Sequence, residues 1–151
     1  MGVTVINTKQ YLGQITRLNR QIQNKLTEIY QLRCMSTNAS APPAKNDKVM
    51  VSKNDDILGD IVGKIVDKER EVDKLVDSFI EKRDTIISQI DGIENDDMYH
   101  VLHLRYVAGK TFEEIRVSTN WSIRQVHRLH GNAISAFEKM YGDQYLGTKC
   151  H

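Results

Sequence analysis

One stretch near the end of the chain carries side chains that can bind nucleic acid. From Trp121 to Ala136 there are two arginines, one glutamine and two histidines, but no acidic residue. Arginine can donate two hydrogen bonds to guanine O6 and N7, and glutamine can pair with the edge of adenine. The same side chains can instead hold phosphate oxygens, as can the N-terminus of a helix. The alternative is a basic helix face that is only solvated.

The histidines raise the question of a metal site. Two pairs stand three residues apart, His100 with His103 and His127 with His130, and such pairs can chelate a metal from one face of a helix. Zinc sites normally use three or four protein ligands, and only the aspartates one turn before His100 offer a third. We therefore expect no metal site.

The chain carries none of the motifs that mark common enzyme classes. It has no phosphate-binding loop with its lysine, no GxSxG or HExxH run and no dinucleotide fingerprint. The aspartates of residues 55–91 are spread at helical spacing around a solvated surface and do not resemble a carboxylate pair. We expect a protein that is not an enzyme and needs no cofactor.

Short, capped helices are expected to position the basic stretch. Apolar spacing predicts a helix over 96–107, begun by one of its first two aspartates and ended before a glycine. Thr111 with Glu114, and Ser122 with Gln125, each match a capping box, in which each side chain binds the other residue's backbone N–H. Two further helices are therefore expected to begin at these two positions.

A turn is expected between the two capped helices. Asn120 is one of the few residues that tolerate the left-handed backbone conformation. Ile115 and Val126 are spaced to face each other across the turn. The segment therefore predicts the tri-helical core of a helix-turn-helix.

This pattern resembles region four of bacterial sigma factors, over about Asp96 to Tyr141. The similar runs are Leu104–Tyr106, Thr111–Ile115, Ser122–Val126 and Ala133–Ile134. With the long helices before it, the chain is similar to small phage and prophage transcriptional regulators of the ArpU-like type. Two positions depart from the pattern: Arg116 stands where a small residue is usual, and Asn120 replaces the usual turn glycine.

The resemblance implies that the helix beginning at Ser122 enters the major groove of duplex DNA. The residues then expected to contact DNA are Ser122, Ile123, Arg124, Gln125, His127, Arg128 and Lys110. It also implies a sequence-specific transcriptional regulator, specifically a phage late-gene activator, with RNA polymerase as a further partner. Because histidines ordinarily titrate just below pH 7, mildly acidic buffer is expected to strengthen DNA binding through His127 and His130.

Two long helices are expected to precede this segment. Apolar residues at three- and four-residue steps predict one helix over Thr8–Cys34, with Thr8 as its N-cap, and a second over 55–91, begun by a pair of aspartates. Residues 35–54 contain both prolines and are expected to form a linker. The sequence thus predicts an all-α protein: a long antiparallel helical hairpin (coiled coil) in residues 1–92, followed by a helix-turn-helix domain in 93–151.

Charge and composition leave the assembly open. Net charge is 5 − 1 = +4 over Thr8–Cys34 and 6 − 11 = −5 over 55–91, which favours pairing of the two helices within one chain or between two copies. A small-terminase-like DNA-packaging protein and a structural coiled-coil adaptor remain alternatives. No apolar run is long enough to span a bilayer and the N-terminus lacks a secretory signal, so we expect a cytoplasmic protein, in the host bacterium if phage-encoded.

Overall fold

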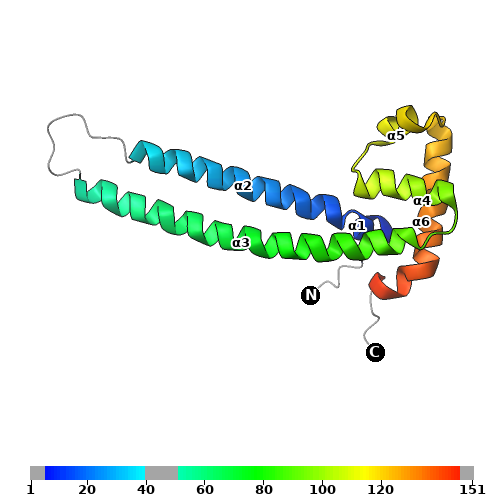
Figure 1. The fold of residues 1–151 in the computed structure, drawn as a ribbon, viewed down its shortest axis with the longest axis horizontal. Coiled ribbons are helices and arrows are strands. Elements are labelled where there is room, and N and C mark those ends of the chain that lie inside the picture. The colour runs from blue at the N-terminus through cyan, green and yellow to red at the C-terminus, as the bar shows by residue number, and fades with distance from the viewer. Residues whose placement is uncertain (1–5, 40–50, 147–151) are drawn as a thin grey trace. The chain divides into compact units, whose positions relative to one another are not determined.

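The structure, a computed structural model, describes residues 6–39 and 51–146. Every regular element in these ranges is a helix, and neither range contains a strand, so the expected all-α class is confirmed. In chain order they are α1 (Thr8–Leu12), α2 (Gln14–Ala39), α3 (Val51–Asp91), α4 (Asp96–Leu102), the π-helix η1 (His103–Val107), α5 (Phe112–Thr119) and α6 (Ile123–Tyr145) (Figure 1). None of these helices combines the length and the apolar character needed to cross a membrane.

The chain divides into two compact units, Met1–Arg17 with Phe79–His151, and Leu18–Ser78. The expected boundary at residue 92 differs from this division, because α1 and the last turns of α3 pack with the C-terminal helices. The ring of Tyr11 in α1 stacks on that of Tyr145 in α6, with 4.1 Å between centroids. The Tyr11 hydroxyl also donates a 2.7 Å hydrogen bond to Gln89 of α3.

Within the first unit, α6 packs against α1, α4 and α5 (Figure 1). The fully buried side chains of this unit come from every one of these helices and from the end of α3. The largest of them are Leu12, Ile86, Ile90, Val101, Leu102, Ile115, Val126 and Phe137. Each large apolar side chain buried in this way contributes about 1.5–3 kcal/mol, so the apolar face of α6 anchors the helix firmly.

The second unit consists of parts of α2 and α3. Lys25 pairs with Glu71 at 3.1 Å, and Lys68 pairs with Glu28 at 2.6 Å. Residue numbers rise along α2 as they fall along α3, so these two segments run antiparallel. Exposed ion pairs add little stability, and this unit relies on an apolar seam of Ile22, Ile29, Ile61 and Val72.

The first predicted helix differs from the structure at its start. It is divided into α1 and α2 at Gly13, and its N-cap is Asn7, whose side chain accepts a 2.8 Å bond from the backbone N–H of Gln10. Thr8, the expected cap, instead shares a 2.8 Å hydrogen bond with the hydroxyl of Tyr145. A tertiary partner therefore uses the hydroxyl that the local pattern had assigned to the cap.

The two long helices extend into both ends of the predicted linker. Residues 35–39 belong to α2 and 51–54 to α3, so the second helix begins before the expected aspartates; the two prolines lie outside the described residues. The Ser36 and Thr37 hydroxyls bind the carbonyl of Arg33 at 3.2 and 3.0 Å. Because these hydroxyls are satisfied inside the helix, they do not end it.

Gly92, between α3 and α4, marks a close approach of two segments. A Cβ atom built at this position would overlap the hydroxyl of Tyr141 and lie 3.2 Å from the carbonyl oxygen of Gln89. The Tyr141 ring also contacts Phe137, with centroids 5.0 Å apart, which limits its freedom to move. Only glycine fits here without displacement.

Replacing Gly92 with alanine is expected to lower the free energy of unfolding by about 1–3 kcal/mol through overpacking. Urea unfolding measures the change. Adding Tyr141→Phe removes the overlapping hydroxyl, so the double variant should lose less than the sum of the two single variants. Additive losses would contradict a direct clash.

Candidate nucleic-acid interface

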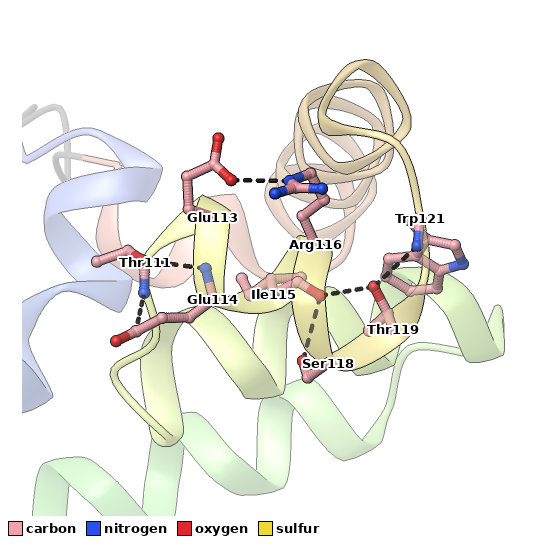
Figure 2. A network of polar contacts seen from close by, with 8 residues as sticks. All are labelled: Thr111, Glu113, Glu114, Ile115, Arg116, Ser118, Thr119 and Trp121. Carbon is pink, nitrogen blue, oxygen red and sulfur yellow. Dashed lines mark hydrogen bonds and ion pairs between the residues drawn. The ribbon is translucent and has the colours of Figure 1, made fainter.

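The expected capping box at the start of α5 is confirmed. The Thr111 hydroxyl accepts a 3.2 Å bond from the backbone N–H of Glu114 (Figure 2). The Glu114 carboxylate in turn accepts a 2.8 Å bond from the backbone N–H of Thr111. Two backbone donors that a helix start leaves unpaired are thereby satisfied. The position at which α5 begins is set by local side-chain chemistry.

The turn after α5 has the expected left-handed residue, since Asn120 adopts φ 60° and ψ 15°. The Thr119 hydroxyl donates a 2.6 Å bond to the carbonyl of Ile115 and accepts a 3.4 Å bond from the backbone N–H of Trp121 (Figure 2). Trp121 is half-buried against the core, with its ring centroid 6.0 Å from that of His100. These contacts fix the direction in which the chain leaves the turn.

Figure 2 also shows where Arg116 goes, a residue that departs from the sigma pattern. It extends outward, with its side chain 46% exposed, and its Nε donates a 2.7 Å bond to Glu113. The larger side chain is therefore accommodated at the surface. Fully buried Ile115 and partly buried Phe112, not Arg116, supply the contact of α5 with the core.

α6 begins with the second expected capping box. The side chain of its N-cap Ser122 accepts a 3.1 Å bond from the backbone N–H of Gln125. In return, Oε1 of Gln125 accepts a 3.3 Å bond from the backbone N–H of Ser122. Because the Ser122 oxygen accepts the bond from Gln125, its hydroxyl proton is not used by the cap. To form two hydrogen bonds with adenine, Gln125 must use its side-chain oxygen. This oxygen already accepts the bond from Ser122, so the contact with adenine would break the cap.

The remaining predicted residues of α6 lie on its exposed side. Arg124, His127 and Arg128 are exposed, and Ile123 is 37% exposed. Because Arg124 and Arg128 are four residues apart, they lie on one face, one turn from each other. The structure thus brings six of the seven predicted residues together at one end of α6.

Lys110, the seventh residue, lies half-buried in the loop before α5. Its carbonyl accepts a 3.1 Å bond from Arg105, whose guanidinium also lies over the ring of Phe112, 4.4 Å from its centroid. Arg105 therefore holds the loop that carries Lys110, a role for which local spacing offers no signal.

The two histidines expected to charge together differ in the structure. His127 is exposed, with its ring 4.7 Å from that of Phe112. His130 is 6% exposed and shares a 2.8 Å hydrogen bond with the Tyr106 hydroxyl. Burial, together with the nearby cations Lys9 and Arg105, lowers the pKa of His130 to about 4.

The expected contribution of His130 to DNA binding at mildly acidic pH is therefore wrong. A histidine with this pKa stays neutral at pH 6 and cannot add positive charge to the surface. The contribution expected of His127 remains a prediction. Sequence spacing had placed both residues on one helix, but the packing of Tyr106 covers only one of them.

In the described part of the chain, no group of three or more histidine, cysteine, aspartate or glutamate side chains is arranged to hold a metal ion. No protein-family model matches the chain, and no curated protein or solved structure is detectably similar to it.

Proposed function

We propose that the chain binds duplex DNA through the first turns of α6. The observation that carries this proposal is an exposed, acid-free helix face opposite a fully buried one. Arg124 and Arg128 are exposed, whereas Val126 and Phe137 of the same helix have no exposed surface. A helix anchored on one side can present its other side to a groove of DNA without losing its support.

In this proposal α5, the turn at Asn120 and α6 act as a helix-turn-helix, while α2 and α3 act as a long antiparallel coiled-coil hairpin. α6 lies in the major groove, where Arg124 and Arg128 can bond guanine or grip phosphates. Ser122 and Lys110 contact the phosphate backbone. Arg105 positions Lys110 by holding its carbonyl and packing on Phe112.

The resemblance of residues 96–141 to sigma region four supports regulation of transcription as the purpose of DNA binding. The similarity to ArpU-like phage and prophage regulators supports a narrower proposal, the activation of late genes with RNA polymerase as a partner. This activity belongs in the cytoplasm of the host bacterium.

The proposal predicts salt-sensitive binding to duplex DNA, measured by the fluorescence anisotropy of labelled duplexes over a series of salt concentrations. Each neutralised phosphate contributes about −0.9 to the slope of log affinity against log salt. If Arg124, Arg128 and Lys110 each neutralise one phosphate, the slope is roughly −2.7 per chain. The duplexes should include the DNA that flanks the gene for this protein.

A single-site control tests whether the loss of any exposed cation lowers the affinity for DNA. Lys82, an exposed cation of α3 outside the α5–α6 segment, is replaced with alanine and should leave affinity and slope unchanged. Lys110→Ala should reduce the slope by about 0.9, as expected for one lost phosphate contact. The proposal fails if no duplex binds, or if binding is insensitive to salt.

A further inference from the structure

One apolar side chain stands among the polar residues at the start of α6. Ile123 is the first residue of this helix and is 37% exposed. Among the described residues, the side chains that form the hydrophobic core or pack against it do not include Ile123. The core therefore does not account for an isoleucine at this position.

The charges around Ile123 limit what can cover it. Arg124 follows it directly and Arg128 lies one turn after Arg124; both are exposed, and no acidic residue occurs from Trp121 to Ala136. An apolar protein surface placed on Ile123 would remove water from these cations without pairing them, which is costly. The major groove of DNA offers phosphates to the cations and an apolar methyl group to the isoleucine. The surface thus matches DNA better than an apolar protein.

The capping box restricts what the polar residues of this turn can read. Because Oε1 of Gln125 accepts the backbone N–H of Ser122 at 3.3 Å, the capped amide has only its N–H donors left for DNA. Adenine presents one acceptor and one donor in the major groove, so capped Gln125 can satisfy only the acceptor. The arginines of this turn match guanine. While the cap is formed, recognition of an A·T pair therefore needs a different side chain.

Thymine provides an apolar target for that side chain, its C5-methyl group, which lies at the major-groove edge. Of the seven residues expected at the DNA, Ile123 is the only apolar one. It also lies in the first turn of α6, and the N-terminal residues of a groove-bound helix are those that reach the base edges. We propose that Ile123 packs against the C5-methyl group of a thymine and so gives the bound sequence an A·T preference. This inference rests on the proposed binding of duplex DNA by α6.

Removing single methyl groups from the DNA tests the proposal. The full chain is used to enrich duplexes from a random-sequence pool, and each thymine of an enriched duplex is then replaced with deoxyuridine, which lacks only the C5-methyl group. At one position, fluorescence anisotropy should show a loss of about fourfold in affinity, as expected for one buried methyl group. When a C·G pair is placed at that position, 5-methylcytosine should bind more tightly than cytosine by a similar factor.

A variant at Ile123 assigns this methyl contact to its side chain. Ile123→Ala should bind the thymine and deoxyuridine duplexes equally, while the salt slope stays unchanged because no cation is lost. Alanine favours the helix and Ile123 is outside the core, so the variant should keep its helical content in circular dichroism. Met140→Ala is the matched control, because Met140 is a 50% exposed apolar residue of the same helix but lies about 25 Å further along it. This control should retain the fourfold difference.

The outcomes separate this inference from the proposed function. If deoxyuridine costs nothing at every position, or costs the same in wild type and Ile123→Ala, the assignment of Ile123 is overturned while DNA binding by α6 stands. Loss of the fourfold difference in Met140→Ala would also overturn the assignment. If the chain binds and enriches no duplex, the proposed function fails, and the assignment of Ile123 fails with it.

Discussion

Replacing Arg124 and Arg128 together with alanine is expected to weaken binding to duplex DNA by roughly 30-fold or more, since each contact contributes at least about 1 kcal/mol. Both side chains are exposed on one face of α6, so the substitutions leave the core intact. If both arginines contact phosphates, the slope of log affinity against log salt also falls by roughly 1.8. Anisotropy titrations at several salt concentrations measure both quantities.

A matched double variant distinguishes the loss of the Arg124 and Arg128 contacts from the loss of net positive charge. Lys64→Ala with Lys74→Ala removes the same charge from exposed positions of α3 in the other unit, and it should bind as wild type does. Equal losses in the two double variants would mean that only overall charge matters and would contradict a specific role for α6.

Arg124→Lys distinguishes reading of bases from holding of phosphates. Lysine keeps the charge but lacks the two-bond geometry with guanine. If Arg124 reads a base, this variant should lose discrimination between duplexes while retaining the salt slope.

His130 is expected to make the folded state increasingly less stable as the pH falls from about 6.5 to 4. Its folded-state pKa of about 4 lies below the ordinary value near 6.5, so in this range the unfolded chain binds a proton that the folded chain does not. The stability that neutral His130 contributes is therefore present above pH 6.5 and is lost on acidification. The lowered pKa corresponds to a loss of roughly 3 kcal/mol in the free energy of unfolding between pH 7 and pH 4.

Urea unfolding of wild type and His130→Gln at several pH values measures this contribution. The fluorescence of Trp121, the only tryptophan, reports on the unit that contains His130. The stability advantage of wild type over His130→Gln should shrink by roughly 3 kcal/mol from pH 7 to pH 4. His127→Gln, at an exposed position of the same helix, should retain the pH dependence of wild type. Parallel curves for wild type and His130→Gln would refute the assignment.

Features that depend on residues close together in the chain were predictable from the sequence. Both capping boxes, at Thr111 and Ser122, need only side chains three residues apart, and both are present. The left-handed turn at Asn120 follows from one residue type. The exposed positions at the start of α6 follow from the 3.6-residue helical period and the placement of Val126 in the core.

The helix ends were less predictable, because tertiary contacts compete with local ones. Thr8 looked like a cap, but its hydroxyl binds Tyr145, and Asn7 takes its place. The cap of α4 is Asn95, not either of the aspartates that follow it. Several neighbouring polar residues can each cap a helix, so the packing of the surrounding helices decides among them.

The amino-acid sequence by itself determined the all-helical class, the start of α5 and α6 and the acid-free face of α6, because these depend on neighbouring residues and helical period. Only the tertiary structure decided that His130 is buried against Tyr106 while His127 stays exposed, and that α1 joins the C-terminal helices. Tyr106 and His130 lie 24 residues apart, and no local pattern encodes such a contact. It arises when separate helices cross and exclude water from the residues between them.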